Sequence, residues 1–139
     1  MRRARAIILC LAAVCLFAFS ACSGCEKNGE SAFVFLSVRL KGGGGTVTAY
    51  AQNEFALGSN VIPVKLELYF SEEKKSDVRD MEAVGNAASD DLDIFEKLET
   101  SANVGGGGYF CAVLRYTLNG ETRLLQSEIL YYDEDGGRK

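Results

Sequence analysis

Two adjacent residues, Asn119 and Gly120, constrain the fold of this chain more than any other short stretch. An Asn-Gly pair between apolar runs is typical of a two-residue type I′ turn, because both turn positions need a positive φ. The run before the pair, Tyr109–Leu118, is apolar on both faces, which is typical of a strand covered on both sides. The run after it, Arg123–Tyr132, alternates, so the pair predicts an antiparallel hairpin. The residues of the second run that are expected to share one face are Leu125, Ser127, Ile129 and Tyr131.

Three earlier segments also have the composition or the alternation of β-strands: Ala32–Leu40, Thr46–Asn53 and Val61–Phe70. In the last two, apolar and polar side chains alternate, which predicts one buried and one exposed face. Two runs of four glycines, Gly42–Gly45 and Gly105–Gly108, interrupt the pattern. Neither run has the flanking residues of a phosphate-binding loop, so both are predicted to be turns.

The remaining segments are less distinctive. Val78–Val84 fits a short edge strand or a helical turn, and we favour the strand; Asn86–Asp91 is expected to be a loop. Leu92–Leu98 fits a strand or one face of a helix, and its position between strands favours a strand. Asp133–Lys139 is a charged tail that is expected to fray. With about seven short strands and no clear helix, the sequence predicts an all-β chain folded as an antiparallel β-sandwich.

One stretch, Gly108–Val113, resembles the penultimate strand of an immunoglobulin-like domain. In that family a tyrosine two residues before a core position closes a corner by bonding back to the backbone, and the resemblance gives this structural role to Tyr109. The chain departs from the family in two places: Thr46–Asn53 has no cysteine to pair with Cys111, and Val61–Phe70 lacks the core tryptophan. The resemblance therefore implies an Ig-like or fibronectin-like architecture rather than a true immunoglobulin domain.

The first 25 residues have the three parts of a secretion signal. Arg2, Arg3 and Arg5 make a positive start, and Ala6–Phe19 comes next without a charge. This apolar run has about 14 residues, whereas a helix that spans a bilayer needs about 20. The small residues that a signal peptidase requires come directly after it.

The junction Phe19-Ser20-Ala21-Cys22 resembles a bacterial lipobox, in which a large apolar residue and two small residues precede a lipidated cysteine. The resemblance implies cleavage between Ala21 and Cys22 and a diacylglyceryl thioether on Cys22. It also implies a bilayer anchor on the extracytoplasmic face of the cell membrane, or on the outer membrane of a cell with two. Two alternatives remain open: an ordinary secretory signal with an incidental cysteine, and an uncleaved anchor helix.

These patterns divide the chain into four parts. Residues 1–21 are the expected signal peptide, 22–31 a polar tether, 32–132 the Ig-like β-sandwich and 133–139 the charged tail.

Charge and composition exclude several functions. Without residues 1–21, Lys+Arg fall from 15 to 12 against 19 acidic residues, so the net charge becomes −7. An acidic domain is a poor binder of nucleic acid and is repelled by anionic headgroups, so the lipid must supply the anchor. The chain has no histidine, which removes Ser-His-Asp and Cys-His catalysis and most zinc and copper sites. No cofactor is expected.

Of the five cysteines, the resemblance to a lipobox implies that Cys10 and Cys15 leave with the signal and that Cys22 takes the lipid. The remaining two, Cys25 and Cys111, form a disulfide in an oxidising envelope or stay apart. We favour Cys111 as a buried, unreactive thiol.

Two side-chain groups are candidates for binding sites. The acids Asp90, Asp91, Asp93 and Glu96 supply oxygen ligands that suit calcium, but their spacing is not that of an EF-hand, and a solvated loop is favoured. The tyrosines either decorate an exposed sheet face or pack across strands, and packing is favoured. They are Tyr50, Tyr69, Tyr116, Tyr131 and Tyr132.

The sequence thus predicts a membrane-anchored, non-catalytic lipoprotein module that binds a protein or glycan partner of the envelope. A structural or assembly accessory of the envelope is the alternative, and a simple secreted β-domain is a further one. An enzyme is disfavoured because no nucleophile constellation is present.

Overall fold

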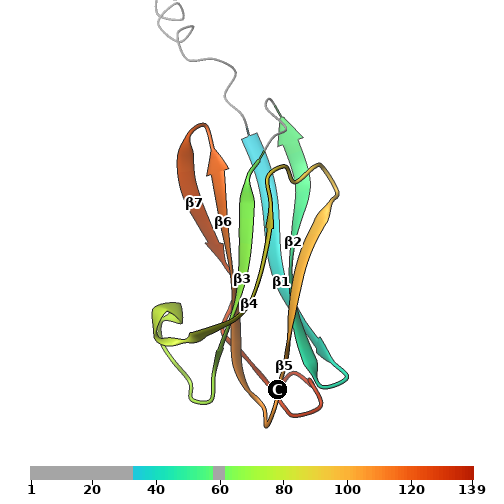
Figure 1. Cartoon of the computed structure of the whole chain (residues 1–139), viewed down its shortest axis with the longest axis vertical. Coiled ribbons are helices and arrows are strands. Elements are labelled where there is room, and N and C mark those ends of the chain that lie inside the picture. The colour runs from blue at the N-terminus through green and yellow to red at the C-terminus, as the bar shows by residue number, and fades with distance from the viewer. Residues whose placement is uncertain (1–32, 58–61) are drawn as a thin grey trace, which may run out of the picture. The chain divides into compact units, whose positions relative to one another are not determined.

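The computed structural model describes residues 33–57 and 62–139. Within these ranges the chain forms eight β-strands and one short 3₁₀ turn, η1 (Val78–Asp80) (Figure 1). The strands are β1 (Phe33–Gly43), β2 (Thr46–Leu57), β3 (Val64–Ser71), β4 (Glu82–Ser89), β5 (Lys97–Asn103), β6 (Gly108–Leu118), β7 (Glu121–Gln126) and β8 (Leu130–Tyr132).

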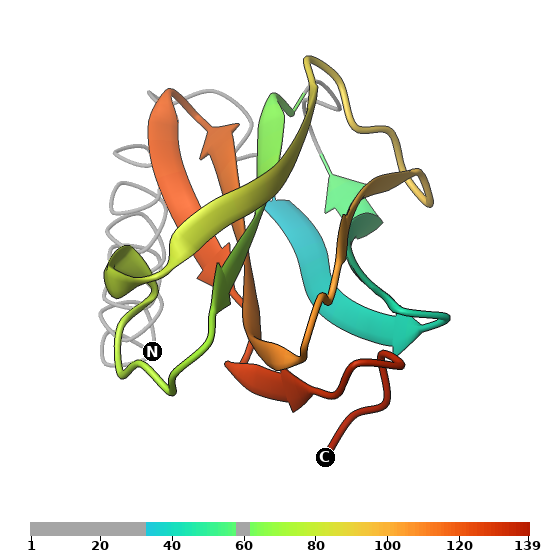
Figure 2. The same cartoon turned by 60° about the horizontal axis from the view of Figure 1, so that its bottom comes forward.

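All strand pairs are antiparallel, and the two sheets pack as a sandwich, so the predicted fold class is confirmed (Figures 1 and 2). Sheet A has the order β1-β2-β5. Sheet B has the order β4-β3-β6-β7, with β8 also paired to β6. In a constant-type immunoglobulin domain the fourth strand lies in the same sheet as the first, second and fifth, which gives four strands against three. Here β4 pairs with β3 of sheet B and not with β5 of sheet A, so sheet A has three strands and sheet B, with β8, has five.

The core lies between the sheets and is built from the alternation of their strands. Every second side chain of β2 points inward, as do those of β3 and β6, because successive side chains of a strand face opposite ways. The Asn119-Gly120 turn has φ values of 52° and 77°, which confirms the hairpin between β6 and β7. The fully buried side chains with the largest volumes include Tyr132, Phe110, Ile62, Leu66, Leu68, Leu92 and Leu114.

The segment Val78–Val84 contains both structures that the sequence allows, a helical turn and the start of an edge strand. Val78–Asp80 is a 3₁₀ turn, and the strand begins only at Glu82. The turn forms because the Asp77 carboxylate accepts a hydrogen bond from the Arg79 amide at 2.9 Å, which caps it. The predicted loop at Asn86–Asp91 is wrong over its first four residues, because β4 runs on to Ser89 at the exposed edge of sheet B, where pairing needs no apolar alternation.

The predicted strand at Leu92–Leu98 is wrong over most of its length. A turn occupies Ile94 and Phe95, and β5 begins only at Lys97. The loop is held by Asn53, whose side-chain amide donates to the Leu92 carbonyl oxygen at 3.0 Å. Two apolar residues of this segment do face the core, since Leu92 is buried in it and Ile94 packs against it. They lie on irregular backbone and not on a strand.

The predicted strand Arg123–Tyr132 is interrupted after Gln126 by Ser127. The Ser127 amide donates to the Ala112 carbonyl oxygen, and the Ser127 hydroxyl accepts from the Ala112 amide, both at 2.9 Å. The Ser127 hydroxyl thus accepts the hydrogen bond that a backbone carbonyl oxygen of the neighbouring strand would otherwise accept. Beyond this point the alternation shifts by one residue, so Tyr132 enters the core and Tyr131 faces outward. The predicted shared face of Leu125 and Tyr131 is therefore wrong.

The C-terminal segment is folded, so the prediction that it frays is wrong. The Asp133 carboxylate accepts from the Gly137 amide at 2.7 Å and from the Asp135 amide at 3.2 Å, which closes a tight turn. The Asp135 carbonyl oxygen in turn accepts from the Gly45 amide at 2.9 Å. This places the tail across the β1–β2 turn, where Gly44 and Gly45 both have a positive φ.

Candidate functional site

The outer face of sheet B carries three tyrosines on neighbouring strands. Tyr109 of β6 is paired with Tyr131 of β8, and their rings meet edge to face with centroids 5.2 Å apart. Tyr69 of β3 is paired with Cys111, so it lies diagonally from Tyr109. All three side chains are half-buried, and the Tyr109–Tyr131 contact fits the favoured prediction of cross-strand packing. The corner role of Tyr109 stays a prediction.

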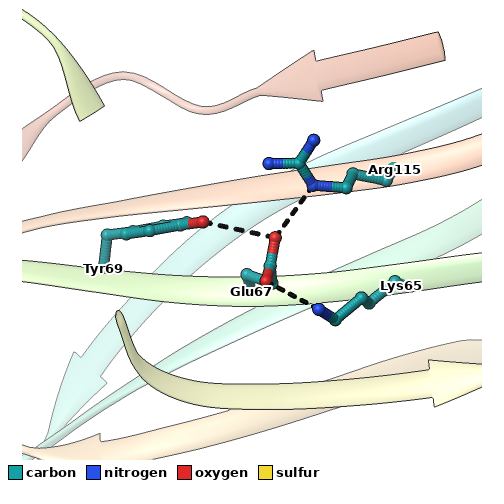
Figure 3. A network of polar contacts seen from close by, with 4 residues as sticks. All are labelled: Lys65, Glu67, Tyr69 and Arg115. Carbon is teal, nitrogen blue, oxygen red and sulfur yellow. Dashed lines mark hydrogen bonds and ion pairs between the residues drawn. The ribbon is translucent and has the colours of Figure 1, made fainter. Parts of the chain in front are cut away.

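Beside these tyrosines, Glu67 accepts hydrogen bonds from three side chains (Figure 3). Its Oε1 atom accepts from Lys65 Nζ at 2.9 Å. Its Oε2 atom accepts from the Tyr69 hydroxyl at 3.2 Å and from Arg115 Nε at 3.0 Å. Only 13% of the Glu67 side chain is exposed.

The environment of Glu67 favours its ionised form. Partial burial would raise the pKa of the carboxyl group, but the hydrogen bonds and charges of Lys65 and Arg115 outweigh it and lower the pKa below its ordinary value. With both oxygens occupied, the carboxylate ties β3 to β6 and has little capacity left for a ligand.

Glu67→Gln should lower the free energy of unfolding at pH 7 by about 1 kcal/mol, because charge-assisted hydrogen bonds become neutral ones. The folded-state pKa is depressed, so the stabilisation is complete above the unfolded pKa and is lost as pH falls through the folded value. The loss of unfolding free energy in Glu67→Gln, measured by urea unfolding, should therefore be smaller at pH 3 than at pH 7. Glu121→Gln, in an exposed pair with Arg123, is the control and should change little. A loss of equal size at both pH values would contradict the network.

The outer face of sheet A is polar and contains a shallow depression of about 370 Å³. Cross-strand pairing builds it: Lys41 of β1 pairs with Thr48 of β2, and Tyr50 of β2 pairs with Glu99 of β5. Gly43 at the end of β1 leaves the hollow open, because it adds no side chain above the sheet. The lining residues are Lys41, Gly42, Gly43, Thr46, Thr48, Tyr50, Lys97 and Glu99.

The depression offers both charge and hydrogen-bonding groups. Lys97 Nζ lies 5.8 Å from the centroid of the Tyr50 ring, within the range of a cation–π contact. The Thr48 and Ser101 hydroxyls are bonded to each other at 2.7 Å. Lys41 and Glu99 form no ion pair with another residue of the described ranges, so their charges are open to an external partner.

The sequence indicated only part of this surface. The polar face of Thr46–Asn53 was visible as alternation, whereas Lys41, Lys97 and Glu99 carry no motif. They reach the same surface because β5 pairs with β2, which the sequence did not indicate.

Cys111 has no disulfide partner among the described residues, and it is buried beneath the segment that links β7 to β8. Burial raises its pKa, so the reactive thiolate is disfavoured. Ala21, Cys22 and Cys25 lie outside the described residues, so the cleavage and the lipidation remain predictions and the alternative of a Cys25–Cys111 disulfide stays open.

The acids before β5 serve the local turn. Asp93 Oδ1 accepts from the Ile94 amide at 2.7 Å, and Glu96 Oε2 accepts from the Asp93 amide at 3.0 Å. In the part of the chain that the structure describes, no three cysteine or acidic side chains gather as a metal site.

No helix within residues 33–57 and 62–139 is long and apolar enough to cross a membrane. No protein-family model matches this chain, and no curated protein sequence is significantly similar to it.

Proposed function

We propose that this chain is a lipid-anchored, non-catalytic module of a bacterial cell envelope, and that its Ig-like β-sandwich binds a protein or glycan partner. The anchor is Cys22, and the binding surface is the depression on the outer face of sheet A. The observation that carries the binding role is the open set of charged and hydroxyl groups around the Tyr50 ring.

The anchor is supported by the arrangement of the first 22 residues and by the short distance along the chain from Cys22 to the folded domain. The described β-sandwich begins at Phe33, which is eleven residues after Cys22. A diacylglyceryl group with a further acyl chain on the new amine would hold such a domain stably at a bilayer, because two or more chains suffice where one does not.

The non-catalytic role is supported by the environment of the acids. The Glu67 carboxylate is occupied by donors from three different side chains. Asp93 and Glu96 bond to backbone amides of their own turn. An ionised group whose hydrogen-bonding capacity is filled by its own fold is a structural group rather than a general acid or base.

The anchor is tested by the intact mass of the membrane-bound product in a bacterial host. We expect the full-length gene to yield residues 22–139 plus a diacylglyceryl group, with or without a further acyl chain. Cys22→Ala should abolish the lipid mass. An unlipidated product in the medium of the parent strain would contradict the anchor and leave a secreted β-domain.

The binding surface is tested by photo-crosslinking in intact cells. A photoreactive residue at Lys41, on the rim of the depression, should give a discrete adduct, whereas the same residue at Arg123 on sheet B should not. Adding Lys97→Ala should reduce the adduct about tenfold, and Lys74→Ala, in the exposed loop after β3, should leave it unchanged. Adduct at Arg123 alone would overturn the assignment to sheet A, and a partner that is itself an assembly component would favour the accessory role.

A further inference from the structure

Three exposed phenylalanines gather at one end of the sandwich. Across residues 33–57 and 62–139 five large apolar side chains are exposed, and these three are 57% (Phe35), 47% (Phe55) and 73% (Phe95) accessible. We name them the aromatic rim. Isolated exposed apolar residues need no explanation, but three aromatic rings at one end of a small acidic domain do.

An irregularity in the β1–β2 pairing turns the Phe55 ring outward, beside the Phe35 ring. Leu36 pairs with Asn53, but Phe35 pairs with Phe55, which leaves Glu54 as an extra, bulged residue. Without the bulge, Phe55 would continue the buried series of β2 that ends at Asn53. The bulge places it directly opposite Phe35 on the outer face of sheet A.

Phe95 joins this end from the other side of β2. Its amide donates to the Asn53 carbonyl oxygen at 2.6 Å, which fixes the loop backbone two residues from Phe55. Its φ is 66°, a left-handed value that is uncommon for a bulky side chain. The fold therefore holds an aromatic residue in an unfavourable backbone conformation while leaving its ring in solvent.

This end of the sandwich is also where the expected anchor joins. β1 starts here, β2 ends here and the β4–β5 loop lies here, whereas the β1–β2 turn and the C-terminus lie at the opposite end (Figure 1). Phe33 is eleven residues from Cys22, a stretch of chain that spans at most about 40 Å. The aromatic rim thus belongs to the end of the domain that a lipid on Cys22 would hold nearest to the bilayer.

We infer that the aromatic rim inserts into the interfacial layer of the bilayer that holds Cys22, and so orients the sandwich on the membrane. The occupant is lipid, and the inference rests on the proposed anchor. The expected net charge of −7 gives no attraction to anionic headgroups, so the contact is apolar. Because the tether keeps the domain at a high effective concentration near the surface, a modest affinity is enough.

The chain contains no tryptophan, so Phe95→Trp introduces a single fluorescent reporter. The mature lipidated chain would be reconstituted into phosphatidylcholine–phosphatidylglycerol vesicles, with and without bromine on the acyl chains. Brominated lipid should reduce the emission of this variant at least twofold. Val84→Trp is the matched control: Val84 is also apolar and exposed, but it lies beside Thr46 and Asn103 at the opposite end, and its emission should not change.

Replacing Phe35 and Phe55 with serine in the Phe95→Trp chain should restore most of the emission. Unquenched Phe95→Trp, or equal quenching at both reporter positions, overturns the inference. A change in the emission of the reporter that grows with protein concentration and does not depend on lipid also overturns the inference. It would assign the aromatic rim to contact with a second copy of the chain. Intact mass is measured first: a chain without lipid refutes the anchor and this inference together, whereas a lipidated but unquenched chain refutes the inference alone.

Discussion

Replacing Tyr132 with alanine should lower the free energy of unfolding by about 3–5 kcal/mol, the largest loss that we expect from one substitution in this chain. Tyr132 is only 2% exposed, and its ring meets the Phe110 ring edge to face with centroids 6.0 Å apart. The ring also lies against Gly42 of β1, so it joins β8 to both sheets. Its removal leaves a cavity that the surrounding strands cannot close without losing their pairing.

Urea unfolding of Tyr132→Ala, Tyr132→Phe and Tyr131→Ala separates the causes of this loss. Tyr132→Phe keeps the ring and should change stability by less than about 1.5 kcal/mol. Tyr131→Ala removes a half-buried ring from the outer face and should cost much less than Tyr132→Ala. Simple alternation from Leu125 places Tyr131 in the core, so equal losses for the two alanine variants would contradict the shift at Ser127.

Gly42→Ala should destabilise the fold by about 1–3 kcal/mol, because a side chain at this position has no room. A Cβ atom on Gly42 would overlap the Gly136 carbonyl oxygen and the Tyr132 ring. One of these is backbone and the other is a packed aromatic ring, so neither can move aside easily. The tail must therefore lift from the β1–β2 turn.

The adjacent Gly43→Ala is a matched control, since a Cβ atom there has nothing within 4 Å. We expect it to be neutral or slightly stabilising. Hydrogen exchange gives an independent readout: the Gly45 amide, bonded to the Asp135 carbonyl oxygen, should exchange faster in Gly42→Ala and at the parent rate in Gly43→Ala. Equal rates in both variants would show that the tail is not held by this contact.

The parts of the fold that the sequence predicted are those in which burial enforces a period of two. Val64–Ser71 and the hairpin around Asn119 belong to this class, because one face of each strand must be apolar. The edge strand Glu82–Ser89 was predicted only at its first three residues, since an exposed edge imposes no such pattern. The loop around Leu92 was mistaken for a strand because apolar side chains can reach a core from irregular backbone that a single asparagine holds.

The candidate binding surface was predictable only in its central strand. Thr48 and Tyr50 stand out as a polar face, but Lys41 and Lys97 join them through strand pairing between distant segments. The one-residue shift of the side-chain alternation at Ser127 could not be predicted either, because it depends on one hydroxyl accepting a hydrogen bond in place of a backbone carbonyl oxygen. Periodicity predicts which strands exist more readily than which strands become neighbours.

The pairing of β1 with β2 has a mechanical consequence. It has eleven residue pairs, from Phe33–Leu57 to Gly43–Thr46, and is interrupted by a single bulge. A load carried by a partner on β2 and β5, resisted by an anchor ahead of β1, would pull the two strands along their length in opposite directions. Under such shear the hydrogen bonds share the force together, whereas in unzipping they break one after another. With the proposed anchor on Cys22, β1 would thus be joined to its neighbour in the geometry that best resists tension.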